Sequence, residues 1–388
     1  MARGIGIGIG KAVEGREAAR QAVQQALESL GTARPVGAFV FFSQEYPVSE
    51  VVSGLGSLPG GLPLLGMSTT RLCTAAGDQA RSVAVAILAS SNWKTQTYWQ
   101  AQYSQDSSGA GRALAQALAT ENEAWNALLL SGDGIQGEAE KVCQALTVLG
   151  MPVAGGLAAG EIQSGRTYQI GGGQWGNGAL AAMALGGRFQ VGIGLGQGWQ
   201  DTGLFFNVTR ARSVWLQGLD GVPPAEVYAR IFGTPARQWA FPPLAQLVRQ
   251  YPFGLEAAPG RLERTVRSPL QVEVDGGFRM NAALKEGDIL HLMVGDTQAC
   301  LDSARAAVRQ ALASLGMARP VFCLVQVDQA WQNLFETRPG QLASALCAEL
   351  GETPFLGAYN LGQIARLPGS AQVNFFNQGI LVTVIGET

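Results

Sequence analysis

Apolar positions along the chain change from a helical spacing to the continuous runs of buried strands. Between residues 19 and 30 they recur every three or four residues, which predicts a helix. Residues 36–43 then form an uninterrupted apolar run, typical of a strand covered on both faces. We expect a short helix at 49–58, a turn at the Pro-x-x-G step 63–66 and a second buried strand at 82–88. Together these form a helix–strand–helix–strand unit.

The same unit occurs again near the C-terminus, and a fainter third copy lies between the two. Residues 19–36 and 304–321 are identical at 14 of 18 positions, which indicates reuse of one unit. Strands that alternate with helices predict an α/β fold of helix-flanked sheets. The elements expected in the later copies are helices at 303–315 and 111–119 and strands at 321–327, 379–385, 126–133 and 178–185.

Residues 186–290 do not follow the unit. Alternating and apolar runs predict a β-rich insert here, with a hairpin turn at Asp275-Gly276. The segment 234–254 is rich in proline and aromatic residues, so we expect it to join two lobes.

Composition excludes some classes of function. Charged residues are 14% of the chain, below the roughly 25% of a typical soluble domain, and 27 basic residues face 29 acidic ones. Without a Lys/Arg run, a nucleic-acid-binding surface is not expected. The sequence has neither a signal-peptide pattern nor an apolar run of membrane-spanning length. Five cysteines without a C-x-x-C motif fit reduced thiols, so we expect a cytoplasmic protein, and the low charge favours self-association into homo-oligomers.

Two glycine-rich runs invite a nucleotide-binding interpretation. "GIGIGIG" at 4–10 never places glycine at the first, third and sixth positions of a dinucleotide loop. The alternation, which recurs in "GIGLGQG" at 192–198, favours strands whose glycine face lets another backbone approach closely.

Catalytic and metal-binding candidates are few. The single histidine, His291, lies in a strand pattern and is interpreted as a hydrogen-bonded core residue; if haem were bound through imidazole, it would be the sole candidate ligand. Ser68 lacks a nucleophile-elbow motif, and Cys73 and Cys323 lack a second histidine to activate them. We therefore expect a protein that is not an enzyme.

Carboxylates that follow buried strands or Pro-x-x-G steps are candidates for a binding site. Asp133, Glu161 and Asp328 stand at such positions, where strand ends of layered α/β proteins converge on a crevice. Aspartate is also common in turns for local reasons, so a purely structural interpretation stands beside this one.

A series of motifs carries a family resemblance. "PLLGMSTT", "FQVGIGLGQGW", "LKEGDILHLMVGD" and "PFLGAYNLGQI" occur in the order found in FIST proteins, and the chain resembles that family over nearly its whole length. The resemblance implies a FIST N domain at 1–235 and a FIST C domain at 236–388.

The resemblance also implies a function. FIST proteins are bacterial sensory modules thought to bind a small, amino-acid-like ligand and to pass its state to a signalling output, here expected to be a separate protein. Some members are haem-binding nitric-oxide sensors that regulate a histidine kinase or a cyclic-di-GMP enzyme, which is the alternative function.

The expected ligand crevice lies where the strand-end loops of the three units meet. Short polar groups on such loops could hold a small ligand without chemistry. The expected lining comprises Ser43, Tyr46, Ser68, Thr69 and Arg71 from the first unit, Asp133 and Glu161 from the second, and Tyr359, Asn360 and Gln363 from the third.

Overall fold

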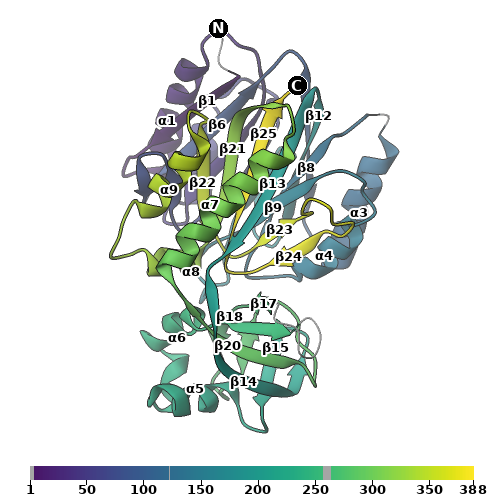
Figure 1. The fold of residues 1–388 in the computed structure, drawn as a ribbon. Helices are drawn as coiled ribbons and strands as arrows, with labels where there is room; N and C mark the ends of the chain where they lie inside the picture. The colour runs from purple at the N-terminus through teal and green to yellow at the C-terminus, as the bar shows by residue number, and fades with distance from the viewer. Residues whose placement is uncertain (1–3, 122, 257–263) are drawn as a thin grey trace.

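The computed structural model describes residues 4–121, 123–256 and 264–388. These residues form two parts (Figure 1). The larger, here called the body, is built by residues before 199 and after 295 and contains three six-stranded sheets. The smaller, the lobe, is built by 199–295 around a seven-stranded sheet. The predicted α/β class, with two lobes and a β-rich insert, is confirmed.

The first unit contains the predicted helices and strands in order, and strand β3 and the hairpin of β4 and β5 lie between α2 and β6. Its strands lie in the order β1-β6-β2-β3, with β2 and β3 parallel and the other pairs antiparallel. The predicted turn at 63–66 is wrong, because Leu64 pairs with Ala38 and strand β3 begins there. The elements are β1 (Ile5–Gly10), α1 (Gly15–Leu30), β2 (Pro35–Ser43), α2 (Val48–Leu55), β3 (Leu64–Thr69) and β6 (Val83–Ala89).

The other two units repeat this strand order, as β7-β12-β8-β9 and β13-β25-β21-β22. The second unit comprises β7 (Trp93–Gln100), α3 (Ser107–Thr120), β8 (Ala127–Asp133), α4 (Ala139–Leu146), β9 (Val153–Ala158) and β12 (Leu180–Gly187). The third comprises β13 (Phe189–Gln197), α7 (Thr297–Ser314), β21 (Arg319–Asp328), α8 (Gln329–Leu334), α9 (Gln341–Leu350), β22 (Phe355–Asn360) and β25 (Gly379–Glu387).

Three hairpins join the units into a closed ring. Each leaves its own unit and pairs with the third strand of another: β4 with β22, β10 with β3, and β23 with β9. No pattern along the chain indicates this exchange. The hairpins are β4 (Leu72–Thr74) with β5 (Gly77–Gln79), β10 (Gln169–Gly171) with β11 (Gln174–Gly176), and β23 (Gln363–Ala365) with β24 (Asn374–Phe376).

The glycine-rich strands explain why helices α1 and α7 have nearly the same sequence. A Cβ atom built on Gly8 would lie well under 3.0 Å from the Ala22 carbonyl oxygen of α1, and one on Gly194 equally close to that of Ala307 in α7. The close-approach interpretation of both runs is confirmed. Since a strand with a bare face accepts only a helix of small residues, strand and helix are constrained together.

The lobe is an insertion between the first strand and the first helix of the third unit. Its bounds differ from the predicted 186–290 because β13 pairs along its length with β25 of the body. Its elements are β14 (Trp199–Arg212), β15 (Trp215–Leu219), α5 (Pro224–Phe232), η1 (Ala236–Ala240), α6 (Leu244–Leu247), η2 (Val248–Gln250), β16 (Phe253–Glu256), β17 (Arg264–Arg267), β18 (Pro269–Val272), β19 (Phe278–Met280) and β20 (Ile289–Gly295).

The chain crosses between body and lobe at two neighbouring points. Gly198 leads into β14 and Asp296 leads out of β20, and the Asp296 amide donates to the Gly198 carbonyl at 3.2 Å. The predicted junction at 234–254 is therefore wrong. Its aromatic residues belong to the lobe core, where Trp239 packs edge-on against Tyr228 at 5.2 Å between ring centroids. The predicted hairpin at Asp275-Gly276 is confirmed by the pairing of β18 and β19.

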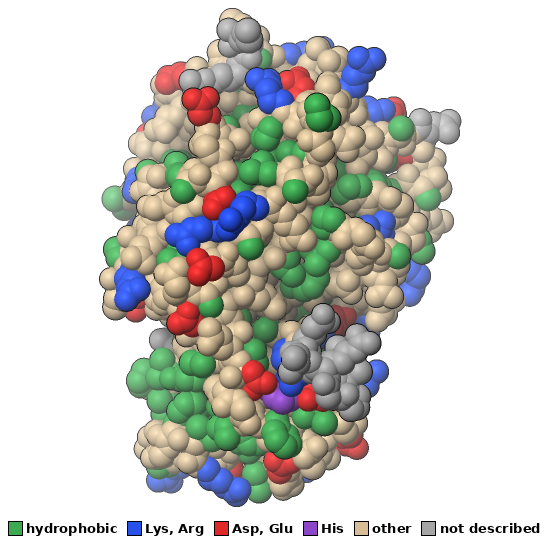
Figure 2. All heavy atoms as spheres, viewed as in Figure 1, with side chains coloured by type: hydrophobic (Ala, Val, Ile, Leu, Met, Phe, Trp, Pro, Cys, Tyr) green, Lys and Arg blue, Asp and Glu red, His purple; other side chains and the backbone are tan. Residues whose placement is uncertain are grey.

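Acidic and basic side chains are scattered over the face drawn in Figure 2 rather than gathered in one patch. In the part of the chain that the structure describes, no helix is both long and apolar enough to cross a membrane.

Candidate functional site

Five of the predicted site residues come together where the third strands of the units end. Thr69 Oγ1 donates to the Tyr359 carbonyl oxygen at 2.5 Å, and Gln363 Nε2 donates to Asn360 Oδ1 at 2.9 Å. Ser68 Oγ donates to a backbone carbonyl of the second unit at 2.7 Å. All five side chains are buried, so these groups tie the strand ends of the three units to one another.

Three other predicted residues are buried and hydrogen-bond to the backbone. Tyr46 packs against α1 and α2, and its hydroxyl lies within hydrogen-bond distance of two backbone carbonyl oxygens, at 2.6 and 2.8 Å. Ser43 is buried at the end of β2, where its Oγ accepts from a backbone amide at 3.3 Å. Asp133 Oδ1 and Oδ2 accept three backbone N–H groups at 2.8 Å; burial raises the pKa of this carboxyl, and these hydrogen bonds act against the rise.

The last two lie closer to solvent. Glu161 is exposed and forms an isolated β-bridge with Arg166, and Arg71 is half-buried. The strand ends therefore converge as expected, while the ten side chains do not share one crevice. That any of them binds a ligand stays a prediction.

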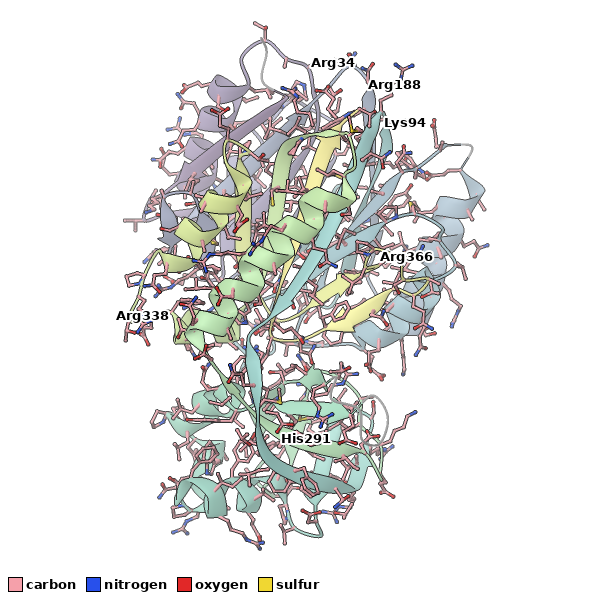
Figure 3. The ribbon with its side chains drawn as sticks, viewed as in Figure 1. Arg34, Lys94, Arg188, His291, Arg338 and Arg366 are labelled. Atoms are coloured by element: carbon pink, nitrogen blue, oxygen red, sulfur yellow. The ribbon has the colours of Figure 1, made fainter. Side chains whose placement is uncertain are left out.

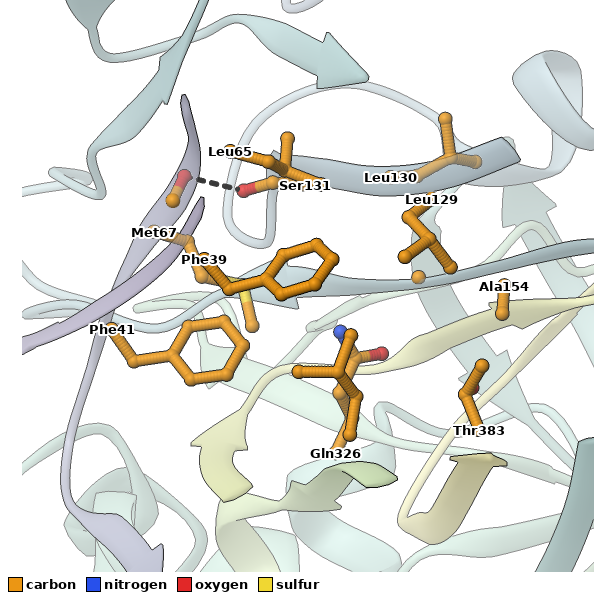
Figure 4. A pocket seen from close by; sticks show the side chains of 13 residues that line it. Phe39, Phe41, Leu65, Met67, Leu129, Leu130, Ser131, Ala154, Gln326 and Thr383 are labelled. Carbon is orange, nitrogen blue, oxygen red and sulfur yellow. Dashed lines mark hydrogen bonds between the residues drawn. The ribbon is translucent and has the colours of Figure 1, made fainter. Parts of the chain in front are cut away.

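The inner faces of the three sheets meet in a common apolar core. Phe39 of β2 stacks on Phe322 of β21, with 6.0 Å between ring centroids. A central cavity opens beside Gln326 and Ser131, whose Oγ donates to the Gly66 carbonyl at 2.9 Å (Figure 4). Its volume of ≈ 10 Å³ holds roughly one water molecule, which is too small for an organic ligand.

A much larger cleft lies between the body and the lobe. Its volume is ≈ 1020 Å³, and among the residues that the structure describes none of the ten predicted ones lines it. The body contributes α4 and the strand β24, and the lobe contributes β16, β17 and the segment before β20. Sequence reasoning missed this cleft because its walls come from three segments far apart in the chain, 138–147, 255–288 and 372–376.

Charged side chains bridge the cleft. Arg267 of β17 donates through Nη2 to Glu140 Oε1 of α4 at 2.7 Å, and Glu140 Oε2 accepts the Ala283 amide of the lobe at 3.3 Å. Arg267 is only 8% exposed, and burial lowers the pKa of its guanidinium while Glu140 opposes that shift. Its Nε and Nη1 are buried with no hydrogen-bond partner among the described residues.

A second polar contact anchors the lobe beside the chain crossings. Arg249 Nη2 of the lobe donates to Asp328 Oδ1 of the body at 2.8 Å, with side-chain exposures of 6% and 0%. Asp328 Oδ2 accepts a hydrogen bond from the backbone N–H of Gln378. The backbone carbonyl oxygen of Gln378 accepts the indole N–H groups of Trp199 and Trp331 at 2.7 and 2.8 Å. The strand-end carboxylate Asp328 thus joins the two parts of the molecule.

His291 lies in the lobe, on β20 (Figure 3). Its Nε2 is 2.8 Å from Glu256 Oε1 and its Nδ1 is 2.8 Å from Asp201 Oδ2. The interpretation as a buried, hydrogen-bonded histidine is therefore confirmed. Within residues 4–121, 123–256 and 264–388, no group of three or more histidine, cysteine, aspartate or glutamate side chains could hold a metal ion.

Comparison with known families agrees with the motif series. A FIST N domain matches residues 38–222, and a FIST C domain matches residues 224–366. The chain belongs to the FIST family. FIST domains are implicated in small-ligand sensing in signalling proteins. The two matched ranges meet just before α5, inside the lobe of this FIST protein, whereas the expected boundary lies between residues 235 and 236.

Similarity to solved structures is weak. A chorismatase crystal structure is 10% identical, covering 100% of this chain and 99% of that chain, with a TM-score of 0.36. A cyanuric acid hydrolase from A. caulinodans is 9% identical, covering 99% of both chains, with a TM-score of 0.39. No curated protein matches the FIST chain.

Proposed function

We propose that this FIST protein is a cytoplasmic sensor that binds a small molecule in the cleft between body and lobe. The observation that carries the proposal is the cleft itself, with a volume of ≈ 1020 Å³ and walls from both parts of the molecule. Ligand sites of proteins commonly occupy clefts of about 300–1000 Å³ between structural units. The family's role in small-ligand sensing supports the same assignment.

The two sides of the cleft differ in how they connect body and lobe. On one side lie both chain crossings and the buried Arg249–Asp328 contact. On the other, the Arg267–Glu140 contact borders the open cleft, and the Glu140 side chain is 30% exposed. A ligand that touches both walls shifts the balance between arrangements of the lobe, pivoting at Gly198 and Asp296.

The altered lobe position is the signal that a separate signalling protein, such as a histidine kinase, reads. The lobe carries exposed apolar side chains suited to a protein contact, including Phe205 and Phe241, which are 60% and 61% exposed. Aromatic side chains are enriched at protein interfaces, and the same surface would serve a homo-oligomer.

Binding without catalysis is part of the proposal. Burial raises the pKa of the thiols of Cys73, Cys143, Cys300 and Cys323, so these cysteines stay protonated and are poor nucleophiles. Ser68 Oγ is committed to a backbone carbonyl. The function is therefore to hold a ligand and report it.

Haem ligation by His291 is not part of this proposal, because both ring nitrogens face carboxylates at 2.8 Å. We expect protein purified from haem-supplemented cells to show no Soret band that depends on His291. An absorption scan of wild type and His291→Ala makes the test, and a band lost in the variant would favour the haem-based nitric-oxide sensor instead.

Hydrogen–deuterium exchange with a metabolite library tests the proposed cleft. We expect at least one compound to slow exchange in α4, β17 and β24 together, because these elements line the cleft. Helix α1, which packs on β1 and α2 and contributes no residue to the cleft, serves as the internal control and should exchange at an unchanged rate. If no compound protects the cleft segments, or protection is confined to the strand ends of Ser68 and Asn360, this cleft is not the site.

A further inference from the structure

The unusual group in the cleft is the guanidinium of Arg267. It offers five N–H donors, and one nitrogen, Nη2, contacts Glu140 at 2.7 Å. Nε and Nη1 are buried and have no hydrogen-bond partner in the described part of the chain. Because a buried donor without an acceptor destabilises the protein, this arginine gains from any acceptor that reaches it.

The present partner of Arg267 can be replaced. Glu140 is 30% exposed, and among the described residues four carboxylates and three cationic side chains line the cleft. An anion that entered without displacing a carboxylate would therefore add to a net negative charge. An anion that takes the place of Glu140 lets this partly exposed carboxylate turn to water. The anion then reaches the guanidinium, whose planar fork matches a carboxylate in a bidentate arrangement.

Part of the remaining lining is apolar. Leu255 of β16 and the body residues Val373, Phe375 and Phe376 contribute hydrophobic surface to the same cleft as Arg267. An apolar group bound against these side chains is removed from water, which favours its binding. The cleft therefore combines one strong anion-binding group with an apolar wall.

We propose that the ligand is a small organic carboxylate that pairs with Arg267 in place of Glu140 and lays its apolar part against Phe375 and Phe376. This inference rests on the proposed function and names its ligand class. Glu140 joins α4 to the lobe through both Arg267 and the Ala283 amide. Displacing it releases these contacts, which couples ligand binding to the position of the lobe.

The test uses the full chain with 3-phenylpropionate and its neutral counterpart, 3-phenylpropanamide, in ligand-observed NMR and calorimetric titrations. We expect the acid to bind at least about tenfold more tightly than the amide, since hydrogen bonds to charged groups contribute about 1.5–3 kcal/mol. Arg267→Met should remove this preference. Glu140→Gln, which weakens the competitor, should strengthen binding of the acid about tenfold. Arg112→Met, an exposed arginine on α3, is the matched control and should change nothing.

Several outcomes overturn the ligand class. Equal binding of acid and amide, unchanged acid binding in Arg267→Met, weaker acid binding in Glu140→Gln, or no binding of either probe would each reject it. Melting curves of both variants establish that they are folded, and Glu140→Gln tests the inference independently if Arg267→Met is not. Protection of the cleft by neutral metabolites alone would reject the carboxylate while leaving the proposed cleft intact, and absence of any protection would reject both.

Discussion

Gly8→Ala and Gly194→Ala are each expected to lower the free energy of unfolding by about 3 kcal/mol. A Cβ at either position would overlap a backbone carbonyl oxygen, that of Ala22 in α1 or of Ala307 in α7. Backbone atoms of a packed helix cannot move aside as a flexible side chain can, so strand and helix must separate. Urea unfolding monitored by circular dichroism measures the loss.

Gly60→Ala is the matched control, because a Cβ there meets no heavy atom within 4 Å. Its stability should lie within about 1 kcal/mol of the wild type. Since Gly8 and Gly194 occupy equivalent strands, β1 and β13, their variants should lose similar amounts. A loss at only one of them would show that the two units do not share this contact.

Asp328→Ala is expected to cost about 3–5 kcal/mol, because it leaves the buried guanidinium of Arg249 without its carboxylate. The same change removes the acceptor of the Ala330 and Gln378 amides. Burial raises the pKa of the Asp328 carboxyl, and Arg249 with these amides acts in the opposite direction. Thermal and urea unfolding of the full chain measure the loss.

The exposed Arg319–Glu387 pair provides the comparison. Its N–O distance is 3.1 Å and its side chains are 76% and 44% exposed, so Glu387→Gln should cost less than about 1 kcal/mol. If Asp328→Ala were no more harmful than this control, the contact between body and lobe would contribute little to stability.

Local patterns in the sequence were sufficient for the units. The helical spacing of residues 19–30 and the apolar run 36–43 correspond to α1 and β2. The glycine alternation at 4–10 predicted a close contact with another backbone, which in the structure is that of α1. These features depend on neighbours a few residues away, so periodicity alone reveals them. The predicted turn at the Pro-x-x-G step was wrong because proline is common in turns, but here it directly precedes the paired strand β3.

Local sequence patterns do not predict contacts between segments that are far apart in the chain. The segment 234–254 looks like a linker, yet its Trp239 packs inside the lobe, and the real crossings at Gly198 and Asp296 carry no Pro-rich signal. The strand ends of the predicted site do converge, and there Ser68 and Thr69 donate hydrogen bonds to backbone carbonyls of other units. Ligand binding by these residues stays a prediction.

The sequence by itself determined the repeated unit, the α/β class, the family and the interpretation of His291, because each depends on local spacing or on a motif in chain order. Only the tertiary structure decided where the cleft lies. Its walls are α4 of the second unit, β24 of the third and an inserted lobe, which meet through the exchange of hairpins and the two crossings. Residue spacing cannot predict how these walls come together, because the hydrogen-bonded pair Arg267 and Glu140 is 127 positions apart in the chain.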